Sequence, residues 1–520
     1  MDFMNELAKN EKSITENGAI GYKTTGHKLV DLNFGIPSYR EKADLDVFDQ
    51  AFAEDKALTL KWLLFLRDVR GGAGERKSFR EFALHLFNKH PKLALKFLDH
   101  INIAEYGRWD DYVWLWDNVK DKDVKNMIAI TLSAIINIDL EAMSKGESIS
   151  LASKWMPSNN TSSKETRRLA NKLAKEVFKV SPRQYRKMLS KLRKYLDVVE
   201  VKASASQWSE IDYCKVPSCA NLKYANAFFK HDAERREEYL NNLVKGDKSV
   251  KINAKALFLH DIVHKYISTN YNYWSLEYEE DATLEELWKA QEKVAGFKNT
   301  LVVRDGSASM TCNIPNSSVT AMDVADALTL YCAENSDGQY HNKFITFSSK
   351  PQIVDVNGKE SLADKLIYLH KYTDCSNTNI EAVFDLILET AIKSKATQDD
   401  MPKSILILSD MEYDAVRSGN VWSYDYDHEA IAQEDEVLFE CIAEKYKKAG
   451  YELPKLIFWN VNSRTNTIPL TESKAGVILL SGFSQSLMEM VMSSELDPYK
   501  ALVKVLEKGR YSVIDSVLEE

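Results

Sequence analysis

The sequence lacks the features that place a protein in a membrane or outside the cell. No uninterrupted apolar run reaches about 18 residues, the length that a membrane-spanning helix needs. Residues 1–6 carry neither the basic nor the apolar region of a signal peptide. The six cysteines are scattered without a Cys-x-x-Cys pair, which favours free thiols in a reducing compartment over disulfides or a zinc site. We therefore expect a cytoplasmic monomer with no membrane partner.

The composition is otherwise that of an ordinary globular protein. The chain has 520 residues, of which 44% are hydrophobic and 28% charged, enough for two or three domains with substantial cores. Its ten histidines are dispersed. His260 and His264 stand one helical turn apart, and a packed helix face explains them better than a metal-binding pair.

The charge is distributed unevenly. The net charge of −9 disfavours nucleic acid as a partner of the whole surface. Residues 163–197, however, hold twelve Lys or Arg against three acidic residues, a local charge of +9, whereas residues 399–440 hold twelve acidic residues against two basic ones, a local charge of −10. A chain polarised in this way presents one face to polyanions and another to cations or a metal.

A short apolar run, residues 301–303, leads through Arg304 to Asp305 and opens into a loop of small residues with Ser307 and Ser309. The Gly-Ser loop favours a buried strand over a buried helix. Alternate spacing lets the three oxygen-bearing side chains turn toward one point beyond the carboxyl end of the strand. Open α/β sheets bind their ligands at that edge.

Two later segments strengthen this signal. Thr378 precedes an apolar helix pattern, and Asp410 ends a second buried-strand run, residues 404–409. Together with the Asp305 loop they resemble the metal-ion-dependent adhesion site of von Willebrand factor A domains. The alternative is that the Ser and Thr residues cap helices and that Asp410 lies in a surface turn.

That resemblance implies that Ser307, Ser309 and Thr378 coordinate a metal directly, while Asp305 and Asp410 act through water. Ligands that are all oxygen, with no His or Cys nearby, favour Mg²⁺, or Mn²⁺ or Ca²⁺, over Zn²⁺. The metal would keep an open position for an acidic group from a protein partner.

The rest of the pattern predicts an α domain followed by an α/β domain. Helical periodicity from about residue 44 to 290 indicates stacked helical pairs in a curved array, without a strict repeat. After residue 296, strands at 301–304, 343–347, 404–409, 455–459 and 475–480 alternate with helices at 320–334, 361–370, 380–394, 429–449 and 485–493, which indicates a doubly wound parallel sheet. The expected parts are an extended segment 1–40 anchored by Leu29, Leu32 and Phe34, a helical domain 41–295 with a hinge around 268–285, a sheet domain 296–495, and a C-terminal segment 496–520 whose helix packs back on the helical domain.

Three short motifs carry a second resemblance. They are Arg-Asp-Val-Arg-Gly-Gly at 67–72, Tyr-Gly-Arg-Trp-Asp-Asp at 106–111 and Lys-Trp-Met-Pro at 154–157. In this order they resemble the TROVE-module proteins, the Ro autoantigen family and its bacterial and phage relatives. The resemblance implies a ring of HEAT-like helical repeats closed by a von Willebrand factor A domain, and RNA as the ligand, with single-stranded ends held in the bore.

The basic stretch is the candidate RNA contact. Met188, Leu189, Leu192, Tyr195 and Leu196 form the expected buried stripe of one helix, which leaves its cations in solvent and Tyr185 available to stack on a base. The candidate RNA-binding residues are Arg167, Arg168, Lys172, Arg183, Arg186, Lys187, Lys191, Lys194, Lys230, His231 and Arg235.

Three functions are compatible with these patterns. The first is a Ro-like protein that holds non-coding or misfolded RNA, structured or by its single-stranded ends. The second is a metal-dependent scaffold that binds an acidic protein partner and no RNA. The third, a metal-dependent hydrolase, is disfavoured because the motif loops offer no Lys or His as a base, although Glu412 and Asp414 follow Asp410 closely. We expect a protein that is not an enzyme.

Overall fold

The computed structural model describes residues 12–255, 257–269, 279–293, 299–347, 350–415, 437–471, 476–491 and 495–519. A helical region up to about residue 298 precedes a mixed, mostly parallel, six-stranded α/β sheet. By their contacts the residues form two compact units. The sheet unit comprises residues 1–58 and 257–506, and the helical unit comprises residues 59–256 and 507–520. These boundaries differ from those expected at residues 40 and 295, because residues 41–58 and 257–295 of the expected helical domain group with the sheet unit.

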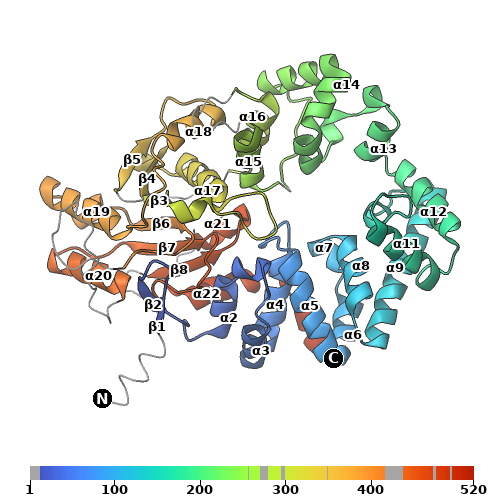
Figure 1. Ribbon diagram of the computed structural model, residues 1–520, viewed down its shortest axis with the longest axis horizontal. Coiled ribbons are helices and arrows are strands. Elements are labelled where there is room, and N and C mark those ends of the chain that lie inside the picture. The colour runs from blue at the N-terminus through green and yellow to red at the C-terminus, as the bar shows by residue number, and fades with distance from the viewer. Residues whose placement is uncertain are drawn as a thin grey trace. The chain divides into compact units, whose positions relative to one another are not determined.

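The sheet has the strand order β5-β4-β3-β6-β7-β8 (Figure 1). Only the β4–β5 pair is antiparallel. The strands are β3 (Thr300–Asp305), β4 (Lys343–Phe347), β5 (Gln352–Asp355), β6 (Ser404–Ser409), β7 (Lys455–Asn460) and β8 (Val477–Ser481). The central strands are covered on both faces, so their sequences are nearly continuous apolar runs, and these runs predicted five of the six strands. The exception is β5, a four-residue edge strand with Ile353 63% exposed, which is too short to show a periodic pattern.

Helices surround this sheet within the same unit. They are α15 (Leu259–Thr269), α16 (Ala282–Lys289), α17 (Ala321–Asn335), α18 (Leu362–His370), α19 (Glu381–Ser394), α20 (Leu438–Lys448), α21 (Met488–Val491) and α22 (Pro498–Leu506). Helix α17 packs on β3, β4 and β6, and α22 packs on β8. The first part of the helix expected at 429–449 and half of the hinge expected at 268–285, residues 270–278, lie outside the described residues.

The N-terminal segment belongs to the sheet unit. It contains the hairpin β1 (Lys12–Ile14) and β2 (Ile20–Tyr22), α2 (Lys28–Phe34) and α3 (Leu45–Glu54). Leu29, Leu32 and Phe34 are buried as anchors, but they lie on a helix and not on an extended chain. This helix of seven residues is too short to show a period in the sequence. Tertiary contact supports it, because Asn460 Nδ2 and Ser481 Oγ donate to the carbonyl of Phe34 at 3.0 and 2.7 Å.

The helical unit is built from helices of very different lengths. They are α4 (Lys56–Arg67), α5 (Lys77–Lys89), α6 (Pro91–His100), α7 (Ile103–Tyr106), α8 (Trp109–Asn118), α9 (Lys122–Ser144), α10 (Ala152–Trp155), α11 (Lys164–Glu176), α12 (Pro182–Tyr195), α13 (Val199–Ser204), α14 (Ser218–Val244) and α23 (Val513–Glu519). Helix α23 packs on α6, while α22, the other helix of the C-terminal segment, stays in the sheet unit.

The three motifs of the helical unit form one set of contacts. Arg67 Nε lies 2.8 Å from Asp111 Oδ2, and Arg80 Nε lies 2.7 Å from Asp111 Oδ1. Arg108 lies over the ring of Trp155, 4.1 Å from its centroid. Each motif therefore contributes a side chain to a common cluster, although the motifs are separated by up to about ninety residues of sequence.

Helix α9 is the longest apolar helix of this unit. Among the described residues it is the one helix that is long and apolar enough to cross a membrane, judged by length and composition alone. This is weak evidence for a membrane span, because core helices of soluble proteins pass the same test. Val124, Ile128, Leu132 and Ile136 are buried at helical spacing, and the helix packs on α6, α8 and α12. This helix was not apparent as an apolar run because Asp139 and Thr131 interrupt it.

Candidate metal site and basic helix face

The candidate metal site forms where two neighbouring strands end. Strands β3 and β6 are parallel, with Arg304 opposite Leu408, so Asp305 and Asp410 leave the sheet at the same edge. Both side chains are fully buried. After Asp305 the chain turns through Gly306 and Ser307 into a short 3₁₀ helix, Ala308–Thr311, which carries Ser309.

Hydrogen bonds tie the two strand ends together. Asp305 Oδ1 accepts from the backbone N–H of Ser307 at 2.9 Å, and its Oδ2 accepts from Ser409 Oγ at 2.6 Å. The hydroxyls of Ser307 and Ser309 lie 3.1 Å apart, and Ser309 donates to Asp410. Four of the five predicted ligands therefore form one contiguous polar cluster.

Thr378 reaches the same edge from a third loop. The carbonyl of Thr378 accepts from the backbone N–H of Asp414 at 3.1 Å, and the carbonyl of Ser376 accepts from the N–H of Ala308 at 3.1 Å. The loop before α19 thus lies between the other two loops, and Thr378 is 1% exposed. All three predicted loops meet at one rim of the sheet.

The electrostatics of this cluster favour a bound cation. Burial, followed by the charge of Asp305, raises the pKa of Asp410 to about 7, while burial also raises the pKa of Asp305. Two carboxyl groups that destabilise each other's charged forms in a dry site gain stability from a cation placed between them. The other donors are hydroxyl oxygens, which fit Mg²⁺. Within the described chain no group of three His, Cys, Asp or Glu side chains is arranged to hold a metal, so this site depends on the hydroxyls.

A buried ion pair supports the loops from inside the sheet unit. Arg304 Nε lies 2.6 Å from Asp326 Oδ1 on α17, and neither side chain is exposed. Arg304 Nη1 also donates to Thr373 at 3.0 Å, five residues before Thr378. His370 Nε2 lies 2.9 Å from the second oxygen of Asp326. The pair therefore links β3, α17 and the Thr378 loop.

Glu412 is a structural anchor. Its carboxylate is fully buried and accepts from the backbone N–H groups of Glu16, Arg464 and Thr465 at 2.9, 2.9 and 3.0 Å. Ser463 Oγ also donates to it at 3.2 Å. These hydrogen bonds join the N-terminal turn and residues 463–465 to the loop that follows Asp410.

Sequence reasoning missed three residues beside the site. Arg464 Nη1 lies 3.2 Å from Asp410 Oδ2, and Arg464 Nε lies 2.7 Å from Glu16 Oε2. Asn17 Nδ2 donates to Thr378 Oγ1 at 3.2 Å. These residues come from distant segments, and neither a motif nor a spacing in the sequence connects them with Asp410.

The two histidines of α15 have different surroundings. His260 is 5% exposed and stacks on Phe258, and burial lowers its pKa to about 3. His264 Nδ1 lies 2.8 Å from Asp323 Oδ2, and its Nε2 lies 3.2 Å from Ser318 Oγ. Asp323 at the same time caps α17 by accepting from the N–H of Thr320 at 2.8 Å. Both histidines join α15 to its neighbours, as the packed-face interpretation expected.

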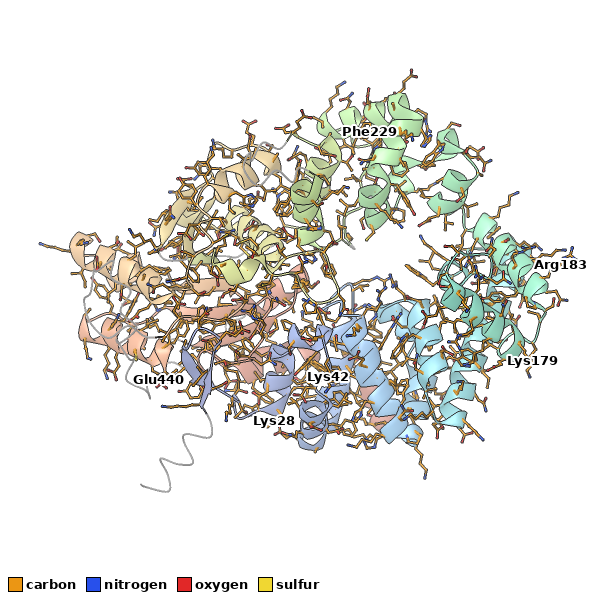
Figure 2. The ribbon with its side chains drawn as sticks, viewed as in Figure 1. Lys28, Lys42, Lys179, Arg183, Phe229 and Glu440 are labelled. Atoms are coloured by element: carbon orange, nitrogen blue, oxygen red, sulfur yellow. The ribbon has the colours of Figure 1, made fainter. Side chains whose placement is uncertain are left out.

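The second candidate site is the exposed face of α12. Ser181 and Gln184 form a capping box at its start, and Tyr185, Leu189 and Leu192 are its buried residues. Its exposed cations have no acidic partner among the described residues; they are Arg183, Arg186, Lys187, Lys191 and Lys194. Arg183 and Lys179 lie at the surface of the α11–α12 pair (Figure 2).

Two expectations for α12 are wrong. Tyr185 is 0% exposed, packs on Phe178 and donates its hydroxyl to the carbonyl of Pro157 at 3.0 Å, so it cannot stack on a base. Tyr185 is buried because it continues the stripe of Leu189 and Leu192 one turn toward the N-terminus. Tyr195, expected in that stripe, is 39% exposed at the end of the helix.

Four of the remaining candidates for RNA contact are engaged within the protein. Lys172 lies 2.6 Å from Asp117, and Arg168 lies 3.7 Å from the same residue. Arg167 donates to the carbonyl of Thr161 at 2.8 Å. Arg235 lies 2.8 Å from Asp232 on α14.

Two candidates on α14 complete the set. His231 stacks on Trp208 with ring centroids 4.6 Å apart, and Lys230 is exposed. The cations left for a polyanion are therefore concentrated on α12.

Comparison with known proteins finds matches over most of the chain. Residues 15–125 and 115–298 match a family described as "Domain of unknown function (DUF2828)", and residues 299–510 match "Domain of unknown function (DUF7788)". The boundary between the two matches falls immediately before β3. A viral protein, "Uncharacterized protein L728" of Acanthamoeba polyphaga mimivirus, is 30% identical over 539 residues, which cover 95% of this chain and 87% of that protein.

Proposed function

The chain belongs to the DUF2828 family, and from this premise and the geometry of its two sites we propose that it is a Ro-like RNA-binding protein with a divalent-cation site. The helical unit holds non-coding or misfolded RNA, and the sheet unit is a von Willebrand factor A-type domain that contacts a protein partner. We also propose that the helices of the helical unit form HEAT-type repeats of the TROVE kind.

One observation carries the RNA proposal. Five cations of α12 are exposed without an acidic partner in the described part of the chain, whereas Lys172, Arg168 and Arg235 are paired. Cations that no carboxylate neutralises are available to phosphates, and releasing the counterions of RNA favours binding. The contacts would follow the backbone and would not read the base sequence.

The test is charge reversal on that face. Arg186→Glu, Lys187→Glu and Lys191→Glu together should weaken the binding of unrelated single-stranded RNA oligomers by at least ten-fold. The slope of log K against log salt should fall by roughly 2, because each lost contact to single-stranded RNA removes about 0.7. Fluorescence anisotropy at several salt concentrations measures both quantities.

A matched variant separates this effect from net charge. Lys120, Lys122 and Lys245 are exposed residues of the same unit that lie on other segments. Their triple reversal to Glu changes the charge equally and should leave RNA affinity close to that of the wild type. If both triple variants bind RNA as the wild type does, the RNA site lies elsewhere.

The cation site supports the second part of the proposal. Mg²⁺ would be held by Ser307, Ser309 and Thr378, with Asp305 and Asp410 as its nearby charges. A bound cation with few direct carboxylate ligands supplies an electrophilic position for an acidic group. The residues of the chain orient and neutralise the ion and perform no bond-breaking step, in accord with the role of Glu412 as an anchor.

Calorimetric titration with Mg²⁺ tests this site. Wild-type protein should bind one Mg²⁺ and gain thermal stability, and binding at 100 times Kd stabilises a fold by about 2.7 kcal/mol. Asp305→Ala, or the shape-conserving Asp305→Asn, should lose both effects. Asp399→Ala removes an exposed carboxylate elsewhere in the sheet unit and should retain them. A wild-type melting temperature that is the same with and without Mg²⁺ would refute the site.

A metal-dependent scaffold that binds protein and not RNA is the second candidate. It is favoured by the complete convergence of the three loops, which is independent of α12. A wild type that binds Mg²⁺ but binds no RNA at any salt concentration would favour this alternative.

A further inference from the structure

The turn of the N-terminal hairpin lies against the rim of the cation site. Strands β1 and β2 pair in antiparallel register, and the turn between them comprises residues 15–19. Gly18 has a φ of +91°, which glycine adopts without the cost that a side chain would add. The N–H of Tyr22 donates to the carbonyl of Ile468 at 2.8 Å, and its hydroxyl donates to Glu440. The hairpin is thereby attached at its base.

At its tip the turn contacts the loop that follows Asp410. Thr15 Oγ1 donates to the carbonyl of Tyr413 at 2.7 Å, and Asn17 Nδ2 donates to the carbonyl of Glu412 at 2.6 Å. The carbonyl of Asn17 accepts from the N–H of Ala415 at 3.2 Å. These bonds hold the turn in register with the site loop.

Two contacts then reach the predicted ligands themselves. Asn17 Nδ2 lies 3.2 Å from Thr378 Oγ1, a predicted direct ligand of the metal. Arg464 lies between two carboxylates, 3.2 Å from Asp410 Oδ2 and 2.7 Å from Glu16 Oε2. The turn therefore holds an amide and a carboxylate at the rim where an external ligand would approach.

The contacts suit reversible docking. Glu16 and Asn17 are exposed, with the side chain of Glu16 at 48%, and each strand of the hairpin has three residues. A hairpin this short has little stability of its own and depends on its surroundings. The side-chain contacts of Glu16 and Asn17 can exchange for water or for another ligand at low cost, while the buried Thr15 and Ala19 hold the base of the turn in place.

We infer that the turn at residues 15–19 is an internal cap of the cation site, with Glu16 and Asn17 occupying the rim that an acidic partner must take over. The inference rests on the proposed function, because it concerns access to that same site. Arg464 connects the cap to Asp410, so a ligand that approaches the metal competes with Glu16. The partner class is a protein segment with an exposed Asp or Glu, and its binding requires the side chains of Glu16 and Asn17 to leave the rim.

The test compares access in capped and uncapped protein. Full-length protein saturated with Mn²⁺ is titrated with the peptide acetyl-Gly-Glu-Gly-amide, and with its Gln counterpart as the probe control. The release variant is Glu16→Gln with Asn17→Ala. The matched hairpin control is Ile14→Thr with Lys23→Ala, because both residues are exposed and lie outside the turn at residues 15–19.

The release variant should bind the Glu peptide at least ten-fold more tightly than the wild type, and the Gln peptide should not gain. The hairpin control should behave as the wild type. Hydrogen exchange at residues 15–19 should accelerate at least ten-fold in the release variant, and in the wild type when the Glu peptide is added.

The outcomes distinguish the cap from the site. Suppose that Mn²⁺ binds both the wild type and the release variant. If the Glu peptide then binds the two proteins with equal affinity, or binds neither protein, the cap is refuted and the metal site stands. If Mn²⁺ binds neither protein, the proposed metal function fails and the cap with it.

Discussion

Arg67 and Asp111 form an ion pair that is closed to solvent, with a distance of 2.8 Å and side-chain exposures of 2% and 0%. Burial lowers the pKa of Arg67, and the charge of Asp111 opposes that effect. Arg80 approaches the second oxygen of the same carboxylate at 2.7 Å. The cluster joins α4, α5 and α8 through one acidic group.

Removal of that acidic group should destabilise the helical unit strongly. Asp111→Asn leaves Arg67 buried without a counter-charge, and breaking a buried pair costs about 3–5 kcal/mol. Urea unfolding followed by circular dichroism measures the loss. Asp110→Asn, at the half-buried edge of the same cluster, is the control and should cost much less. Equal effects of the two substitutions would contradict the central role of Asp111.

Gly107 should tolerate no side chain. A Cβ there would lie 2.5 Å from both Arg67 Nε and Asp111 Oδ2, closer than such atoms approach. Gly107→Ala should therefore displace the buried pair and lower the free energy of unfolding by roughly 1–3 kcal/mol, the range for overpacking. Gly146→Ala is the control for steric crowding, because a Cβ there would meet no atom within 4 Å. Its φ of +75° adds a separate backbone cost to that substitution. Unchanged stability of Gly107→Ala would show that the buried pair does not restrict this position.

Acid should destabilise the sheet unit through His260. Its pKa is about 3 in the folded protein, against about 6.5 in an unfolded chain. The unfolded chain therefore binds the proton first as the pH falls, and stability is lost between pH 6.5 and 3, by about 1.4 kcal/mol per pH unit at most. His260→Phe should flatten this part of the curve of unfolding free energy against pH. A curve that stays as steep would assign the acid sensitivity to other groups.

His264 should act in the opposite direction. Its hydrogen bond to Asp323 raises the pKa of the imidazole, so the folded protein holds that proton more tightly. The resulting stability is fully present below pH 6.5 and is lost as the pH rises through the folded pKa. His264→Gln should remove a decline in melting temperature above pH 6.5. Persistence of the same decline in the variant would show that this pair does not cause it.

The two proposed ligands should bind independently. The cations of α12 belong to the helical unit, and the cluster of Asp305 and Asp410 belongs to the sheet unit. EDTA should therefore leave RNA affinity unchanged at constant ionic strength, as measured by anisotropy. Loss of RNA binding on chelation, reversed by Mg²⁺ and not by added Na⁺, would show that the two sites are coupled.

The sequence predicted the parts whose chemistry is local. Strands β3 and β6 are buried on both faces, so their apolar runs and the polar residues at their ends were visible without a structure. The convergence of Asp305 and Asp410 then followed from parallel pairing alone. Strand β5 was missed because four residues at an edge carry no periodic signal.

The remaining features depend on contacts between distant residues. Arg464 and Glu16 meet beside Asp410 only through the fold, and no spacing relates them. The wrong prediction that Tyr185 is available to stack on a base has another origin. An aromatic residue among cations is compatible both with a stacking position and with the buried stripe of the helix. Packing against Phe178 selects the buried stripe.

The sheet unit draws its residues from sequence on both sides of the helical unit, and this order affects synthesis. The carbonyl of Phe34 accepts hydrogen bonds from residues 426 and 447 positions later in the chain. A ribosome that adds 5–20 residues per second needs roughly 20–90 s to make that length. Throughout this interval the buried residues of α2 lack their packing surface, because the segment that contains Asn460 and Ser481 has not yet been translated.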